Sequence, residues 1–222
     1  MLNKNERRTK ETRDLLLRSA ETIFVRDGYE GAELGEIATL AGRTKGAIYA
    51  HFENKEDLFI ALFAERMTLY ADRMREMLAS STSTDQSLQI FRKFYVGTLE
   101  DKNWLLLLLE FKLLAIRHPE SKERLRKVHK ELLPQAHNEQ EFTKVFGSGG
   151  YGKAALSRSL AVATLAPILS ALAVEAQFEP ALLEEHALKK VAGRLFDALL
   201  APPHVDLDQD HGNNPAMAMN LT

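Results

Sequence analysis

The stretch Leu34–Phe52, LGEIATLAGRTKGAIYAHF, decides the fold of the N-terminal part of this chain. Its apolar spacing predicts two short amphipathic helices, at 33 to 40 and 44 to 51, separated by a turn that contains Gly42. This is the sequence form of a helix-turn-helix, which places its second helix in the major groove when it binds DNA. The same shape is common in proteins that never contact DNA, so the surface residues must decide.

The second helix of this motif has two different faces at about 100° per residue. The face expected to pack inward carries Thr44, Ile48, His51 and Phe52. The opposite face carries Gly46, Ala47, Tyr49 and Ala50, with Lys45 at its edge. Glycine and alanine remove side-chain bulk, so the helix backbone could lie close to base edges.

Four kinds of DNA contact follow from these positions. Lys45 can reach guanine O6 or N7, and Tyr49 can donate its hydroxyl to a phosphate. Lys55 begins the next helix and would add a cation to its free amides, forming a phosphate clamp. The segment from Met1 to Arg18, with a local charge of about +3, would supply a basic arm before the first helix, Arg7 and Arg8 included. A solvated Lys45 and a packed His51 are the ordinary alternatives.

The run Ile37-Ala-x-x-Ala-Gly-x-Thr-Lys-Gly-Ala-Ile-Tyr-x-His-Phe-x-Asn-Lys-Glu-x-Leu58 resembles the DNA-binding signature of TetR-type transcriptional regulators. The resemblance covers residues 7 to about 62. It implies a homodimer whose two N-terminal domains bind a palindromic double-stranded DNA operator until a small-molecule effector in the C-terminal domain releases them. This chain is thus expected to be a repressor rather than an enzyme.

By position, the resemblance implies which residues contact which part of the duplex. Bases would be contacted by Lys45, Gly46, Ala47 and Ala50, and phosphates by Tyr49, His51 and Lys55. Arg43, Thr44, Arg7 and Arg8 complete the expected DNA-binding set. Arg43 departs from the family's branched apolar residue, and Glu33 lies near a position that is often a phosphate-contacting Ser or Thr.

The rest of the chain also predicts helices and no strands, because period-two alternation is absent. We expect an all-α protein of about nine helices, at 9 to 27, 33 to 40, 44 to 51, 55 to 79, 85 to 100, 103 to 117, 120 to 146, 153 to 177 and 181 to 200. Asn54 is the expected N-cap of the fourth helix, with Asp57 as its capping acid. The expected domains are a DNA-binding domain at 1–55, an effector-binding and dimerisation domain at 56–202 and a disordered tail at 203–222.

The apolar run from Asn103 to Pro119 predicts a central helix enclosed by others, beside which an effector pocket could form. The candidate pocket residues are Phe91, Phe94, Tyr95, Trp104 and Phe111 as walls, with Glu110 and His118 as polar anchors. Ordinary core packing is the alternative for each aromatic residue. By resemblance, the helices near 153–177 and 181–200 would form the four-helix bundle of the dimer.

Composition sets limits on the remaining function classes. The 222 residues carry a formal charge of −2 and contain no cysteine, so a polybasic nucleic-acid coat, a disulfide framework and a thiolate metal site are excluded. We expect a cytoplasmic protein without cofactor, metal site, export signal or membrane span. The Gly147–Gly150 segment lacks the context of a nucleophile turn or phosphate loop. A helical protein-interaction module without sequence-specific DNA binding remains the alternative function.

Overall fold

The computed structural model describes residues 3–132, 158–179 and 185–200. Within these ranges the chain forms helices joined by turns and contains no strand, which confirms the expected all-α class. The segment Gly147–Gly150, the remainder of the expected 120 to 146 helix and the expected tail at 203–222 lie outside the described residues.

The described ranges contain nine helices, and most of their ends fall close to those expected. The helices are α1 (Lys4–Gly31), α2 (Leu34–Leu40), α3 (Lys45–Tyr49), α4 (Lys55–Ala79), α5 (Thr84–Thr98), α6 (Lys102–Arg117), α7 (Pro119–Leu132), α10 (Arg158–Phe178) and α11 (Glu185–Leu200). Below, the head is residues 4–57, and the body is the described residues from 58 onward.

The first helix departs most from its expected start at residue 9. It begins at Lys4, because Asn3 accepts a hydrogen bond from the Glu6 backbone N–H while the Glu6 side chain accepts one from the Asn3 N–H. The basic residues at 7 and 8 therefore lie on a helix, and the expectation of an arm preceding the helix was wrong. Near its other end, Gly28 has a φ of 71° and interrupts the helix.

The turn between α2 and α3 explains why Gly42 is needed. Gly42 has a φ of 62°, its N–H donates to the Thr39 carbonyl, and the Arg43 N–H donates to the Ala38 carbonyl. This hydrogen-bond pair is the Schellman arrangement, which ends a helix with a left-handed residue. The chain therefore turns sharply at the end of α2, and two residues after Gly42, Arg43 and Thr44, lead into α3.

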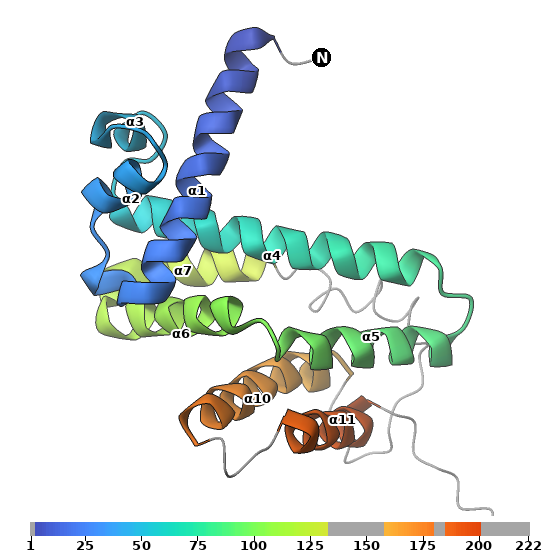
Figure 1. The fold of residues 1–222 in the computed structure, drawn as a ribbon. Coiled ribbons are helices and arrows are strands. Elements are labelled where there is room, and N and C mark those ends of the chain that lie inside the picture. Colours follow the sequence, from blue (N-terminus) through green and yellow to red (C-terminus); the bar gives the residue numbers. More distant parts are fainter. Residues whose placement is uncertain (1–2, 133–157, 180–184, 201–222) are drawn as a thin grey trace, which may run out of the picture.

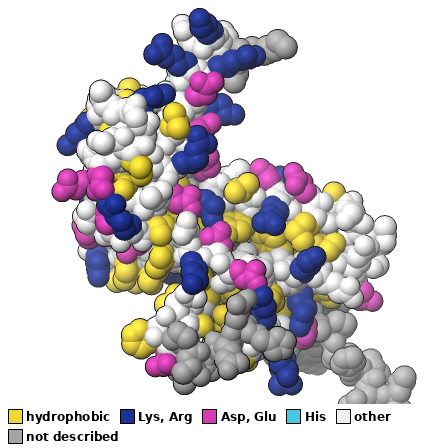
Figure 2. All heavy atoms as spheres, in the orientation of Figure 1, with side chains coloured by type: hydrophobic (Ala, Val, Ile, Leu, Met, Phe, Trp, Pro, Cys, Tyr) yellow, Lys and Arg dark blue, Asp and Glu magenta, His cyan; other side chains and the backbone are white. Residues whose placement is uncertain are grey.

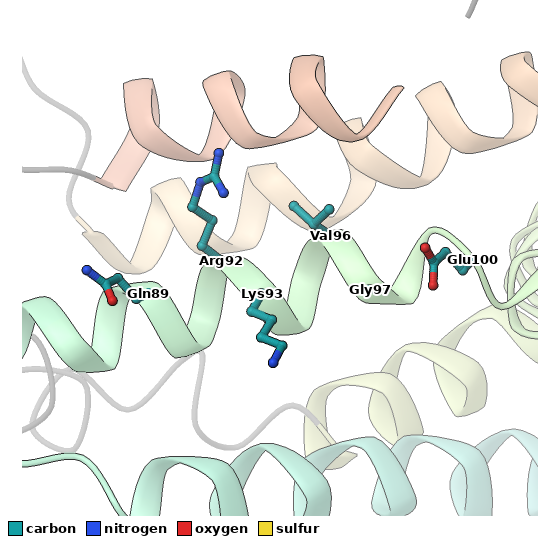
Figure 3. A pocket seen from close by; sticks show the side chains of 6 residues that line it. All are labelled: Gln89, Arg92, Lys93, Val96, Gly97 and Glu100. Atoms are coloured by element: carbon teal, nitrogen blue, oxygen red, sulfur yellow. The ribbon is translucent and has the colours of Figure 1, made fainter. Parts of the chain in front are cut away.

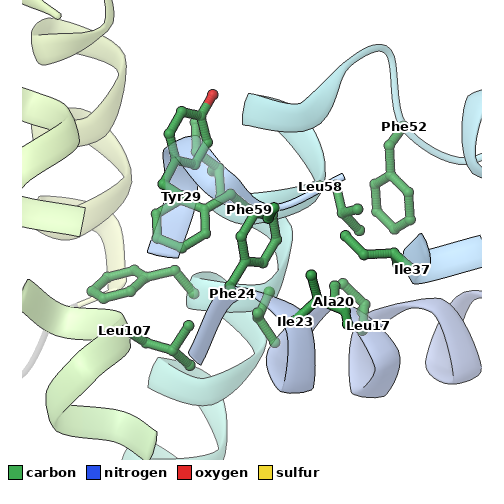
Figure 4. Packing of buried hydrophobic residues seen from close by; sticks show 14 of the residues in the cluster. Leu17, Ala20, Ile23, Phe24, Tyr29, Ile37, Phe52, Leu58, Phe59 and Leu107 are labelled. Carbon is green, nitrogen blue, oxygen red and sulfur yellow. The ribbon is translucent and has the colours of Figure 1, made fainter. Parts of the chain in front are cut away.

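Two hydrophobic clusters hold the helices together, and they do not divide at residue 55. The first cluster joins the head to α6 and α7, with Phe24, Phe59 and Leu107 almost completely buried (Figure 4). The second joins the end of α4 and the helix α5 to α10 and α11. Consequently α4 and α6 belong to both clusters and connect the head with the far end of the body (Figure 1).

The helix α6 was expected to be enclosed on nearly all sides, and this expectation was wrong. Its buried side carries Trp104, Leu107 and Phe111, but Leu106 is 43% exposed and Ile116 is 73% exposed. No described helix is both long enough and apolar enough to span a membrane.

Candidate nucleic-acid interface

The helix α3 is held in the head by two apolar side chains. Ile48 is completely buried, and Phe52, just after the helix, is 3% exposed. The N–H groups of His51 and Phe52 both donate to the Ile48 carbonyl, which prolongs the helix by a tight turn. The inward positions expected for Ile48 and Phe52 are therefore confirmed.

The opposite side of α3 is open. Lys45, Gly46, Tyr49 and Ala50 are exposed, whereas Ala47 and His51 are half-buried. Thr44 was expected to face inward, but it is exposed because it occupies the extended N-cap position, before helical spacing begins. A Cβ placed on Gly46 would meet only the Thr44 hydroxyl, at 3.7 Å, so packing within the chain does not require a glycine there.

Lys55 does not present its ammonium group beside the amides of α4. Its Nζ donates to the carbonyl oxygens of Glu30 and Ala32, at 3.1 and 3.4 Å, and lies 4.8 Å from the centre of the Tyr29 ring. The lysine therefore neutralises the carbonyl end of α1, and its expected role as a phosphate clamp has no geometric support. The N-cap of α4 is as expected, since the Asn54 side chain accepts from the Asp57 N–H at 2.8 Å.

Three further basic residues of the head that were expected to contact DNA, Arg43, Arg7 and Arg8, are exposed. The Arg43 guanidinium donates to the adjacent Gly42 carbonyl at 3.1 Å, so it folds back over the turn before α3. Arg7 and Arg8 lie on the projecting first turns of α1, where lysine and arginine side chains gather (Figure 2). Glu33 is exposed at the N-cap position of α2 and makes no side-chain cap hydrogen bond.

The two residues expected to anchor an effector instead join the body to α1. The Glu110 carboxylate accepts a hydrogen bond from the Tyr29 N–H at 3.0 Å, an amide that the break at Gly28 leaves without a helical partner. His118 lies between Glu30 and Glu120, at 2.9 and 3.2 Å. These carboxylates raise the pKa of the imidazole, and His118 lowers the pKa of Glu30. Their expected role as polar anchors of a pocket thus lacks geometric support.

The corner between α6 and α7 makes further contacts with the start of α4. Arg124 of α7 forms ion pairs with Glu56 and Asp57, at 3.3 and 2.7 Å, and the Ser121 hydroxyl donates to Glu56. The body therefore holds both the end of α1 and the beginning of α4, which are the two helices that flank the helix-turn-helix (Figure 1).

The five aromatic residues expected to line a pocket form one continuous row, but only with two residues that the sequence analysis missed. Phe63 stacks on both Phe111 and Trp104, with ring centres 3.8 and 5.2 Å apart. Tyr70 contacts both Trp104 and Phe94, at 5.2 and 5.9 Å. Tyr95 then joins Phe94 to Phe91. The spacing from Phe59 to Tyr70 along α4 could have indicated these partners, because it brings Phe63 and Tyr70 to one side of that helix.

A polar group lies beside this row at the start of α6. Asp101 caps α6 by accepting from the Trp104 N–H at 2.9 Å, and it also accepts from the Tyr70 hydroxyl and the Arg66 guanidinium. Burial opposes ionisation of Asp101, but these donors lower its pKa. Burial and the Asp101 contact raise the pKa of Tyr70, and burial raises that of Tyr95 to about 12.

A hollow of about 400 Å³ lies on α5, and none of the predicted pocket residues lines it. It is lined by Gln89, Arg92, Lys93, Val96, Gly97 and Glu100 (Figure 3). Two of its charged residues already have partners on α11, because Arg92 pairs with Asp197 at 3.0 Å and Glu100 pairs with Lys189. Among the described residues, no group of three or more His, Asp and Glu side chains could bind a metal ion.

Comparison with known proteins finds sequence matches that include most of the head. Residues 16–62 match the family model described as bacterial regulatory proteins of the tetR family. A curated repressor, BepR of Brucella suis, is 51% identical over 57 residues, which are 24% of this chain and 27% of that protein. The fatty acid metabolism regulator protein of Bacillus subtilis is 32% identical over 75 residues, or 34% of this chain and 39% of its own. The chain thus matches less than half the length of these relatives.

Solved structures extend the likeness in fold beyond the head. A fatty acid degradation regulator, FadR, from Bacillus halodurans superposes with a TM-score of 0.64 at 23% identity, covering 83% of this chain and 94% of that one. A TetR-family regulator from Mesorhizobium loti gives the same TM-score and identity over 87% and 97% of the two chains. At these identities the match concerns the fold alone, so the likeness to the family in sequence depends on the head. Residues 16–62 of this chain match the tetR family of bacterial regulatory proteins.

Proposed function

We propose that this protein is a ligand-responsive transcriptional repressor that binds a palindromic operator in the cytoplasm as a homodimer. The observation that carries the proposal is the exposed side of α3, where a lysine, a tyrosine and small residues face solvent although packing does not require Gly46. Glycine costs about 0.5–1 kcal/mol in a helix relative to alanine, so a bare surface there favours close approach by an external partner.

The proposed contacts follow from where the side chains lie. Lys45 contacts a base edge at the N-terminal end of α3, and Tyr49 donates its hydroxyl to a phosphate. Gly46, Ala47 and Ala50 let the helix backbone approach the bases. Arg43, Thr44, His51, Arg7 and Arg8 would surround this contact with donors to phosphate oxygens.

A second copy of the chain would complete the operator-binding unit. The described part of α10 packs on α11, yet it leaves Ile168 and Phe178 exposed at 40% and 83%. Large exposed apolar side chains favour an interface, and a two-fold axis through it would present two copies of α3. Such copies bind half-sites about 34–36 Å apart.

The effector would act on the body, and its signal would reach α3 through helices that the two regions share. The half-buried members of the aromatic row, Tyr70, Phe94 and Tyr95, are our candidates for contact with an apolar effector. A shift of α4 or α6 would change the distance between the two copies of α3. Coupling of this kind is commonly worth about 1–3 kcal/mol.

Selection of bound duplexes from a random DNA pool tests this proposal. We expect an inverted repeat, with binding to the selected duplex that weakens steeply as salt increases, since contact with about 6 to 10 phosphates releases as many counterions. A helical protein-interaction module would enrich no sequence. Recovery of no repeat at low salt would therefore contradict the proposed function.

A further inference from the structure

The first turns of α1 project from the head beyond α3 (Figure 1). Every side chain from Asn3 to Glu11 is exposed, whereas Thr12 to Leu15 are half-buried and burial is complete at Leu16. The projecting part from Lys4 to Arg13 is about 14 Å long at about 1.5 Å per residue. Packing within the described chain accounts for the helix only from about Thr12 onward.

Two features keep the projecting part helical. The reciprocal hydrogen bonds between Asn3 and Glu6 satisfy N–H groups at its start. It also continues a helix already anchored by Leu16 and Phe24, so no new helix has to be nucleated. Its cations are therefore presented on a defined scaffold rather than on a flexible arm.

The cations of the projecting part form no ion pair with any described residue, although the charge of Arg13 favours the ionised form of Glu65. Within the described residues, no ion pair involves Lys4, Arg7, Arg8, Lys10 or Arg13, although ion pairs are frequent elsewhere on the head and body. Glu6, which could have neutralised one of them, is engaged in the cap. The excess positive charge is therefore available to an anionic partner.

The direction of two of these cations is set by the core. Steps of four, three, four and three residues back from Phe24 pass through Ala20 and Leu17 and reach Arg13 and Lys10, so both lie toward the packed side of α1. The Arg13 guanidinium lies 5.4 Å from the centre of the Phe52 ring, immediately after α3. Arg7 and Arg8 are turned about 120° and 140° from Arg13.

We propose that the projecting part of α1 is a second DNA-contacting element, which lies along the sugar-phosphate backbone beside the base pairs contacted by α3. Lys10 and Arg13 face the duplex, and Arg7 and Arg8 contribute less to the contact with phosphates. The inference rests on the proposed function and assigns backbone contacts to Lys10 and Arg13 individually, two residues of the basic segment from Met1 to Arg18. A duplex carries one charge per about 1.7 Å of its axis, so a 14 Å helix can run past several phosphates.

The test compares two double variants that remove the same charge from the same helix. Lys10→Ala/Arg13→Ala should lower the salt dependence of binding to the selected duplex by about two ions, because each phosphate contact contributes about 0.9 to the slope. Arg7→Ala/Arg8→Ala should change the slope by less than half as much. The sequence recovered by selection should be the same for both variants and for the wild type.

A single variant separates DNA contact from folding. Arg13→Ala also removes the contact with Phe52, whereas the exposed Lys10 has no contact of this kind; Lys10→Ala should therefore keep the wild-type urea midpoint and lower the slope by about one ion. An unchanged slope for Lys10→Ala, or equal losses in the two double variants, would overturn the inference. If the wild type itself enriches no duplex, the proposed function has failed instead.

Discussion

The exposed side of α3 and the corner between α6 and α7 are both surface regions that carry charged side chains. They differ in whether those side chains have partners within the chain. At the corner, His118, Arg124, Glu56 and Asp57 all have partners within the chain. On α3, Lys45 and Tyr49 are exposed, and no ion pair or side-chain hydrogen bond involves either among the described residues.

This difference separates groups that hold the chain together from groups offered to another molecule. A charge paired within the fold contributes to stability and costs energy to redirect, whereas an unpaired surface charge costs little to redirect toward a phosphate or base. Lys45 and Lys55 are only ten residues apart, yet Lys45 has no partner among the described residues and Lys55 donates to the carbonyls of Glu30 and Ala32. The sequence pattern alone assigned both lysines to DNA contact.

The largest expected effect distinguishes these two lysines. Lys45→Ala should cost about 1–3 kcal/mol of binding to the selected operator and relax the base preference at one step. Lys55→Ala should instead lower the free energy of unfolding by about 1 kcal/mol, because the carbonyls of Glu30 and Ala32 lose a donor. Salt titrations and urea unfolding measure the two effects. A lower salt slope with unchanged stability in Lys55→Ala would restore the phosphate clamp.

The next effect concerns the place where the body holds α1. Gly28→Ala should destabilise the protein by about 1–2 kcal/mol, since its φ of 71° is unfavourable for a side chain. The added Cβ would also lie 3.0 Å from a Glu110 carboxylate oxygen. Gly35→Ala is the matched control, because a Cβ there meets nothing within 4 Å. Equal urea midpoints for the two variants would show that the break at Gly28 tolerates a side chain.

A smaller effect has opposite signs in folding and binding. Gly46→Ala should stabilise the fold by about 0.5–1 kcal/mol, because alanine favours the helix and the Thr44 hydroxyl leaves room for a methyl group. Operator binding should fall on the order of tenfold, about 1.4 kcal/mol, if the backbone of α3 approaches the bases closely. A more stable variant with undiminished binding would place that backbone away from the duplex.

Local patterns in the sequence were sufficient for the helices and for the motif. The Asn54 cap, the turn at Gly42 and the burial of Ile48 and Phe52 each depend on residues close together in the chain. The early start of α1 was missed because its first turns carry no apolar residue. The capping pattern of Asn3 and Glu6 was nevertheless present and could have indicated that start.

The roles of individual polar residues depended on partners far away in the sequence. Glu110 stands in an apolar run and therefore suggested a ligand anchor, but its partner is an amide 81 positions away that is free because of Gly28. His118 was assigned to the same pocket and instead contacts Glu30, 88 positions away. No local spacing reveals such pairs, since they exist only once α6 packs against α1.

The smallest expected effect is the pH dependence of the His118 contact, which belongs to the paired side of the comparison. The carboxylates of Glu30 and Glu120 raise the pKa of His118 above its ordinary 6.5. A raised pKa means that the stabilisation is fully present below pH 6.5 and is lost as the pH rises through the higher folded-state value. The lower limit is set by Glu30, whose pKa is lowered from 4.5, so its contribution is lost only below that pH.

Urea unfolding between pH 5.5 and 8.5 measures this dependence. The wild type should exceed His118→Gln in stability most clearly at pH 5.5, and the difference should shrink as the pH rises through the raised pKa. Introducing Glu30→Gln/Glu120→Gln into both proteins should remove the trend, because the imidazolium then has no carboxylate partner. A difference that stays constant with pH would mean that the imidazole acts only as a neutral hydrogen-bonding group, and the α6–α7 corner would then hold α1 independently of pH.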